Sequence, residues 1–435
     1  MARYFMSIVF LGCLLALATG QSCLAAELEW GGHVKVFGKL LSPQEDTGLD
    51  AVARGGNTDG FGEIRVNNKA YYTDEIYSEL HWEGIIAGGE TRLDGEKLKR
   101  QFPMLYPAGL VNPPSDDRRL VDLTGVLYED RGTMVYHRLD RAMVAYAPEW
   151  GEVRLGRQAV TWGHGFTFNP MDLFNPFAPT DLERDYKVGD DMALVQFPWA
   201  SSALDSPVDV ELLYVARRNI HTDSADFEES SIAAKLGFYA AETLGIDFMI
   251  ARHYEDYVSG LGFVGYIGDA AWRLDLTGTY LEKEQNGEHA YLSAVANIDY
   301  SWLWLGKNWY GYTELYYNGL AGGDYGEELA DPAVSARLAR GELYALGSWY
   351  WSGQVNVELH PLVNAYLNGI VNLEDPSGVI QPRLVYDYTQ NLQLSVSAAV
   401  NWGDKGSEYG GFYAEGIPFK KAPSDTIAAW CTYSF

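Results

Sequence analysis

The chain has 435 residues and a formal net charge of −27 at pH 7, with 47% apolar and 14% aromatic residues. This acidity argues against nucleic acid as a partner, because phosphates attract basic surfaces. A helical membrane protein is also excluded, because no apolar run after residue 26 approaches the roughly 20 residues that a spanning helix needs. The 30 Tyr, 13 Trp and 46 Gly instead favour strands joined by tight turns.

The first 26 residues are typical of a secretory signal peptide. Arg3 supplies the positive charge, FMSIVFLGCLLALATG is apolar but short for a membrane span, and SCLAA offers small residues for cleavage. We therefore expect export through the general secretory pathway and a mature domain at residues 27–435. Cleavage removes two of the three cysteines, so Cys431 remains alone and the mature chain has no intramolecular disulfide.

Segments of alternating apolar and polar residues follow one another along the rest of the chain. In AYLSAVANIDYSWLW (290–304), for example, apolar side chains recur at every second position. This period of two predicts strands with one apolar face. The expected strands are 28–41, 61–72, 76–88, 133–147, 151–161, 189–199, 207–219, 230–241, 244–253, 257–268, 270–282, 289–305, 308–320, 342–359, 361–374, 378–388, 391–403 and 425–435.

The connections between these segments are sorted by length. Every second one is short, such as YTDE, PEWG and IGDA, whereas most of those between are longer. This parity is typical of an outer-membrane barrel with short turns on one rim and long loops on the other. The sequence therefore predicts an all-β fold, a transmembrane antiparallel up-and-down β-barrel of 16–18 strands, with 18 preferred. The count is weakest at 254–256 and 375–377, where long loops are expected and short connections occur.

The chain ends on a strand pattern, TIAAWCTYSF (426–435), with apolar residues on one face. A sheet in hydrocarbon must have no free edge, because each unpaired backbone group costs several kcal/mol there. We therefore expect the last strand to pair with the first. A terminal strand with Tyr433 and Phe435 also resembles the assembly signal of bacterial outer-membrane barrels, which implies the barrel-assembly machinery as a partner.

Residues 162–188 interrupt the strand pattern. Glycines and prolines forbid a long regular element, yet several Phe, Met and Leu residues are too apolar for a solvated loop. A folded-in loop that narrows the pore accommodates both facts, and an external cap packed on its neighbours is the alternative. The connection 89–132 is also long, and the sequence leaves open whether it folds inward or caps the barrel.

Arg157 conflicts with the alternation of its strand. Strict alternation places it on the lipid side, where an arginine at the midplane costs about 2–4 kcal/mol. Either a bulge at Gly156 turns it inward, or the register runs the other way and places Arg154 outside. We favour the bulge, since glycine permits one.

Three stretches carry a family resemblance: LGRQAVTWG, NPMDLFNPF and ERDYKVGDD. They resemble a family of porin-like Gram-negative outer-membrane proteins, and the LGRQ strand also resembles the alginate-export type of barrel. The likeness is tight across residues 133–195 and architectural elsewhere. Alginate exporters have a basic lumen, whereas this chain has far fewer bases than acids, so the resemblance favours the fold over polysaccharide export.

The predicted function is an outer-membrane porin for passive or weakly selective diffusion of small hydrophilic solutes. The alternatives are a poly- or oligosaccharide transport barrel, and a barrel that sheathes a periplasmic or extracellular partner such as an electron-carrying protein. No GxSxG or HExxH motif occurs and the eight His are scattered, so we expect no enzyme, cofactor or metal site. Other expected partners are outer-membrane lipid, lipopolysaccharide and, in a homo-oligomer, further copies of the chain. The candidate residues of the pore and its constriction are Arg154, Arg157, His164, Asp172, Asp181, Glu183, Arg184, Asp185, Lys187, Arg273, Asp275, Asp299, Arg383 and Asp387.

Overall fold

The computed structural model describes residues 27–53, 55–102, 115–174, 176–181, 183, 185–200, 207–285, 288–321 and 323–435. The expected signal peptide, residues 1–26, lies outside these ranges. Among the described residues, no helix is long and apolar enough to cross a membrane.

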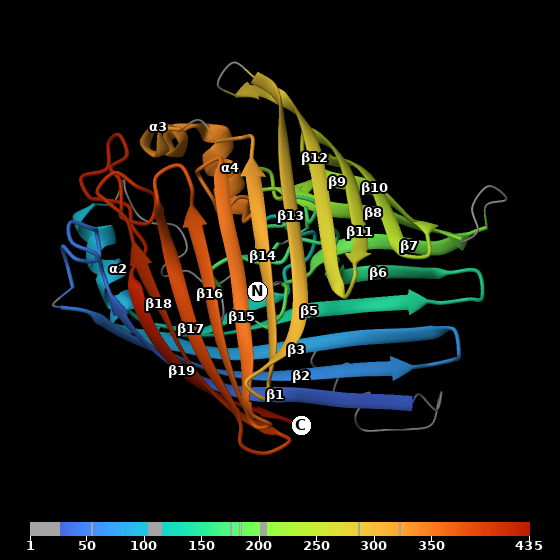
Figure 1. Cartoon of the computed structure of the whole chain (residues 1–435), viewed down its shortest axis with the longest axis horizontal. Coiled ribbons are helices and arrows are strands. Elements are labelled where there is room, and N and C mark those ends of the chain that lie inside the picture. The colour runs from blue at the N-terminus through green and yellow to red at the C-terminus, as the bar shows by residue number, and fades with distance from the viewer. Residues whose placement is uncertain are drawn as a thin grey trace.

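Antiparallel strands form one continuous sheet that closes on itself (Figure 1). Eighteen strands make the ring, and each pairs with its neighbour in chain order, which confirms the predicted fold class and strand number. The strands of the ring are β1 (Glu27–Ser42), β2 (Asn57–Tyr71), β3 (Ile76–Gly89), β5 (Thr133–Tyr146), β6 (Glu152–Gln158), β7 (Asp190–Trp199), β8 (Val208–Asn219), β9 (Ser224–Ala241), β10 (Leu244–His253), β11 (Asp256–Ile267), β12 (Ala270–Gln285), β13 (Glu288–Trp304), β14 (Lys307–Asn318), β15 (Trp349–His360), β16 (Val363–Asn372), β17 (Ser377–Asp387), β18 (Leu392–Trp402) and β19 (Asp425–Ser434).

The two faces of the sheet differ as the alternation predicts. On β13, Leu292 is 67% exposed on the outer face, whereas Val295 and Asn297 are buried on the inner face. The same contrast recurs around the ring, so that large apolar side chains cover the outside and polar side chains line much of the inside. Such an arrangement suits a barrel whose outer surface meets hydrocarbon.

Closure occurs between the two ends of the described chain. β1 pairs with β19 from His33–Ser434 to Ser42–Asp425, and with β2 on its other side. The backbone N–H of Gly32 donates to the carbonyl of Phe435 at 3.1 Å, and the N–H of Phe435 donates back at 3.0 Å. The expected pairing of the last strand with the first is thus present, and it leaves this sheet without a free edge.

The seam between β1 and β19 offers a direct test of closure. Cys431 is the one free cysteine among the described residues, and its partner in the register is Val36. We expect Val36→Cys to form a disulfide with Cys431 under mild oxidation, because directly opposed positions on paired strands have Cα atoms about 5.5 Å apart. Non-reducing electrophoresis of the mature protein would show it as a band of altered mobility. Val34→Cys, which lies two positions away, should not cross-link.

The connection between β3 and β5 contributes to the wall as well as to the rim. It contains α2 (Glu90–Gln101) and β4 (Thr124–Glu129), and β4 pairs with β5 outside the closed ring. Phe102 contacts Phe419 edge-on at 4.8 Å between ring centroids, which joins this connection to the one before β19. The described part of 89–132 is therefore partly an extension of the sheet, an arrangement that the sequence did not predict.

Two further helices lie in the connection between β14 and β15, α3 (Tyr325–Ala330) and α4 (Pro332–Arg340). Asp331 caps α4, since its side chain accepts hydrogen bonds from the N–H groups of Ala333 and Val334. Gly341 ends the helix with φ of 71°, a left-handed conformation that favours glycine. Strand β15 consequently begins at Trp349, whereas the sequence placed its start at residue 342.

Candidate functional site

The segment between β6 and β7, residues 159–189, is called the inner segment below, and its described residues lie inside the barrel. Trp162, Met171 and Phe174 are almost fully buried and pack against inner-face side chains such as Leu213 and Met249. The inner faces of β7 to β11 are unusually apolar where the segment covers them. Burial against this wall explains why the segment is rich in Phe, Met and Trp although it has no regular secondary structure in its described residues.

Glu314 on β14 holds the middle of the inner segment. Its side-chain oxygens accept hydrogen bonds from the backbone N–H groups of Phe166, Thr167 and Phe168, at 2.7, 3.0 and 2.9 Å. A segment without helix or strand leaves its N–H groups unpaired, so an acceptor from the wall replaces the missing backbone partners. Glu314 is itself fully buried. It therefore fixes the inner segment to the barrel wall.

His164 makes a second attachment. Its Nδ1 lies 2.8 Å from Asp275 Oδ1 on β12, and its Nε2 lies 3.2 Å from Asp247 Oδ2 on β10. Burial alone would lower the pKa of His164, but hydrogen bonds and charge attraction from the two carboxylates raise this pKa to about 9. The imidazole is thus protonated at neutral pH and donates from both nitrogens.

We expect this attachment to weaken in alkaline solution. Because the pKa of His164 is raised from 6.5 to about 9, its charged contact stabilises the fold fully below pH about 6.5 and is lost as the pH rises through about 9. The thermal unfolding temperature in detergent should therefore differ most between wild type and His164→Ala near pH 6, and least near pH 10. His221→Ala, in an exposed loop, should show no such pH-dependent difference. A constant difference at all pH values would contradict the prediction.

The second half of the inner segment reaches strands on the other side of the ring. Lys35 Nζ on β1 donates to Asp185 Oδ2 at 2.8 Å and to the carbonyl of Glu183 at 2.5 Å. The ring of Tyr186 lies 4.1 Å from the guanidinium carbon of Arg65 on β2. Since β10, β12 and β14 hold the first half, the described residues of the segment contact strands around much of the inner circumference.

Charged side chains line the inner faces of β1 to β5 and pair with one another. Arg65 is fully buried, contacts Glu83, and donates to Asp140 Oδ2 at 2.7 Å. Arg138 donates to the same Glu83 at 2.5 Å. These contacts place arginines and carboxylates in one compact network. The positive side chains on this flank of the lumen are therefore paired with negative ones and do not form a patch of a single charge.

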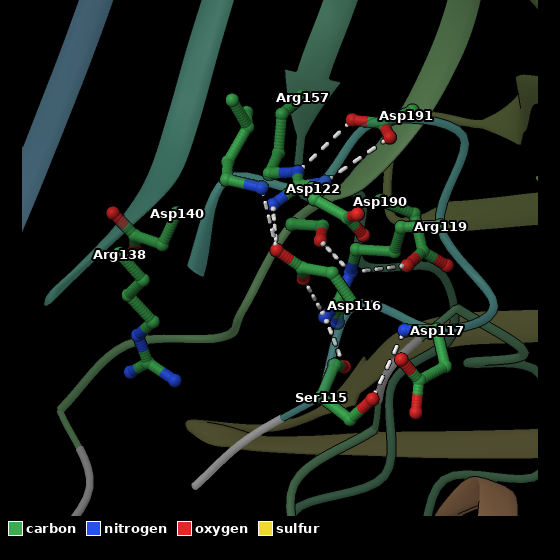
Figure 2. Close-up of polar contacts among 12 residues, drawn as sticks. Ser115, Asp116, Asp117, Arg119, Asp122, Arg138, Asp140, Arg157, Asp190 and Asp191 are labelled. Carbon is green, nitrogen blue, oxygen red and sulfur yellow. Dashed lines mark hydrogen bonds and ion pairs between the residues drawn. The ribbon is translucent and has the colours of Figure 1, made fainter. Parts of the chain in front are cut away.

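Arg157 lies under residues 115–123 of the preceding long connection. Its guanidinium binds both carboxylate oxygens of Asp191, at 2.9 and 3.1 Å, and Asp116 Oδ2 at 3.1 Å. Figure 2 shows Arg157 and Asp116 directed toward one another, with Arg119 beside Asp190 in the same cluster. Burial alone would raise the pKa of Asp116. The nearby charges of Arg157 and Arg119 lower this pKa by more than burial raises it, so the net pKa lies below the usual range.

The predicted bulge at Gly156 is wrong. β6 pairs with β5 and with β7 without a register shift through Gly156 and Arg157. Gly156 does adopt φ of 118°, a conformation that suits glycine. Arg157 avoids exposure because residues 115–123 cover it and because two carboxylates neutralise it.

The remaining predicted residues lie in several separate contacts. Arg154 pairs with Glu152, Arg273 with Asp299, and Asp172 with Lys187, while Asp387 accepts from Gln393 at 2.9 Å. The guanidinium of Arg383 lies 5.2 Å from the ring of Trp430, and Asp181 accepts from the N–H of Glu183 at 3.0 Å. Arg184 lies outside the described residues. Among the described residues, no group of three His, Cys, Asp or Glu side chains is placed to hold a metal ion.

Sequence reasoning missed Glu314, Asp247, Lys35 and Arg65 as partners of the inner segment. A signal existed for Glu314, because it is the one carboxylate in the aromatic strand WYGYTELYYN. An ionisable side chain on the inner face of such a strand must find a partner, but the sequence does not say which.

A cavity of about 270 Å³ remains between the inner segment and β14 to β17. The segment contributes mainly apolar side chains together with Thr167 and Asp181, whereas the wall contributes Tyr312 and three amide side chains. The lining residues are Phe166, Thr167, Phe177, Ala178, Pro179, Asp181, Tyr312, Gly353, Gln354, Asn368, Gly369, Ile370 and Gln381.

No protein-family model matches the sequence, and no curated protein matches it. Solved structures with a similar fold include OccK9 (OpdG) and OccK11 (OpdR) of Pseudomonas aeruginosa, each 11% identical with a TM-score of 0.53. These matches cover 94% of this chain and 98% and 96% of the other chains. The outer membrane protein opdK of the same organism is 8% identical with a TM-score of 0.51, covering 94% of this chain and 98% of that one. At such identity the likeness shows a shared fold.

Proposed function

We propose that this chain is an outer-membrane channel for passive or weakly selective diffusion of small hydrophilic solutes, and that the inner segment forms its constriction. The observation that carries the proposal is the pairing of an apolar outer surface with a polar interior crossed by one folded-in segment. Lipid and lipopolysaccharide would surround such a barrel, and the barrel-assembly machinery would insert it. Association with further copies of the chain belongs to the same proposal.

The similar solved structures support this proposal at the level of the fold. One of them is an outer membrane protein by its own name, and it matches 94% of this chain. The signal peptide expected at residues 1–26 is part of the proposal, because a barrel of this kind must first cross the inner membrane.

The alternative of a sheath around a folded partner is disfavoured by the inner segment. Such a barrel needs an unobstructed lumen, whereas Glu314 and Lys35 hold the segment to different parts of the wall. Transport of a poly- or oligosaccharide stays as a second candidate, which does not rest on the alginate-export-type resemblance. It is favoured by the uncharged amides that line the cavity beside the segment.

Reconstitution of the purified mature protein in planar lipid bilayers tests the proposal. We expect discrete, ohmic single-channel steps in potassium chloride, with little preference between the cation and the anion. A protein that unfolds cooperatively on heating in detergent and yet yields no channels in repeated reconstitutions would refute the proposal.

A further inference from the structure

Four inner-face residues of neighbouring strands lie opposite one another in one row. Tyr312 on β14 pairs in register with Gln354 on β15, Gln354 with Asn368 on β16, and Asn368 with Gln381 on β17. Neighbouring strands are about 4.8 Å apart, so the row places a phenol and three amides side by side along roughly 15 Å of wall. All four side chains line the cavity beside the inner segment. We call them the amide row.

The amide row keeps hydrogen-bonding capacity that the protein itself does not use. Among the described residues, the side chains of Gln354 and Asn368 have no hydrogen-bond partner. Gln381 uses one donor, which reaches the carbonyl of Thr180 at 2.9 Å, and its oxygen stays available. Asn356 lies two residues beyond Gln354 on β15, toward the short turn that leads to β16. Its buried side-chain oxygen also lacks a partner in the described structure. Each amide carries two donor hydrogens and an acceptor oxygen, so the row faces the cavity with both kinds of group.

Aromatic rings complete the other side of this cavity. Phe166 of the inner segment stacks on Tyr312, with ring centroids 4.4 Å apart, and Phe177 lines the same space. The neighbouring row of paired residues begins with three uncharged members, because Tyr310 pairs with Asn356 and Asn356 pairs with Tyr366. Its fourth member, Arg383, pairs with Tyr366. Flat apolar faces thus stand beside groups that both donate and accept hydrogen bonds.

The charge distribution distinguishes this flank from the opposite one. Among the described residues, Asp181 is the one charged side chain that lines the cavity. On the flank of β1 to β5, by contrast, Lys35, Arg65 and Arg138 are engaged by carboxylates of the wall or of the inner segment. A cation that entered the cavity would find only the carboxylate of Asp181, which already accepts from the N–H of Glu183, and an anion would find no cation among the described lining residues. Either ion would lose hydration for little or no countercharge, whereas an uncharged solute would not incur this cost.

We propose, on the basis of the channel function proposed above, that the amide row is a binding subsite for uncharged polyhydroxylated solutes, of the class of sugars and polyols. Each hydroxyl of such a solute is a donor and an acceptor, which matches the side-chain amides. Its carbon–hydrogen faces match the apolar surface that Phe166 and Phe177 contribute to the lining of the cavity. In the described lining of this cavity, a carboxylate solute finds no cation.

Solute block of the ion current tests the subsite with matched probes. Sorbitol, gluconate and glucosamine carry similar hydroxyl groups with no charge, a negative charge and a positive charge. Each would be titrated against the open-channel current of the full mature protein in a planar bilayer. We expect sorbitol to reduce the current saturably and at a lower concentration than either charged probe.

Two variants and one control locate the effect. Gln354→Leu and Asn368→Leu should each raise the half-blocking concentration of sorbitol about tenfold, because each removes hydrogen bonds to the solute. Asn364→Leu makes the same change on the same strand, four residues from Asn368 and outside the cavity lining, and should leave the block unchanged. Asn364→Leu should also keep the wild-type ionic conductance in the absence of solute.

The outcomes separate this subsite from the channel function. Suppose that the wild-type protein conducts ions and yet is blocked by gluconate or glucosamine at a lower concentration than by sorbitol. That result would refute the proposed subsite and leave the proposed channel function standing. So would sorbitol block that Gln354→Leu and Asn368→Leu do not weaken. Absence of any ion conductance would overturn the channel and the subsite with it.

Discussion

Replacing residues 164–181 by a short Gly-Ser linker is expected to raise the single-channel conductance several-fold. This stretch contains the attachments to Glu314 and Asp275 and the rings that occupy the space beside the amide row. The closed ring of backbone hydrogen bonds does not depend on it, because the strand pairings that close the ring join ring strands to one another and include no described residue of this stretch. The barrel should therefore still assemble, with a wider passage.

A control variant keeps the inner segment and changes an outer loop. Removal of Lys405 and Gly406, two exposed residues of the connection before β19, should leave the conductance unchanged. Glu314→Ala lies between the 164–181 replacement and the wild type. It keeps the inner segment but removes the acceptor for three N–H groups of that segment. We expect it to increase the noise of the open channel. Unchanged conductance of an assembled 164–181 variant would show that the constriction lies elsewhere.

The strands and their closure could be predicted because the signals are local. A period of two in side-chain polarity defines a strand whatever lies beside it, and the parity of loop length gives the up-and-down order. The positions at which strands begin and end were harder to predict where the alternation is interrupted. β9 begins at Ser224, six residues before the expected start, because the alternation of Ala225 and Phe227 with polar residues is broken by the four polar residues 228–231.

Two features of the connections carried signals that the strand analysis did not use. The stretch DPAVSARLARG has an Asp cap, a proline at the first helical turn and a terminal glycine, which together indicate a helix at α4. β4, in contrast, is short and has no distinctive pattern, and its existence depends on pairing with β5. Such an element is decided by tertiary contact.

The site could be predicted in outline but not in its contacts. An apolar, proline-rich segment between two strands of a barrel must bury its rings, and this requirement is enough to predict that residues 162–188 pack against a wall. Which wall residues hold the segment depends on register and on side chains over 100 positions away, such as Asp275 for His164. Sequence separation of this size leaves no local signal.

Loss of the Arg157 charge is expected to have the largest effect on stability. Arg157 is 1% exposed, and its guanidinium contacts Asp191, Asp116 and the carbonyls of Val121 and Leu139. Arg157→Met removes the cation and leaves two buried carboxylates without it. Breaking a buried ion pair in this way typically costs about 3–5 kcal/mol, so the urea midpoint of unfolding in detergent should fall clearly.

The double variant Arg157→Met/Asp191→Asn decides whether the loss comes from uncompensated charge. Removing both partners costs less than removing one when the penalty lies in the carboxylate left behind, so the double variant should recover part of the stability. Lys283→Ala is the matched control, because Lys283 pairs with Glu255 while its own side chain is 75% exposed. Exposed pairs contribute about 0–1 kcal/mol, and this change should be nearly silent. If Arg157→Met also left the urea midpoint unchanged, this arginine would not be what holds residues 115–123 against β6 and β7.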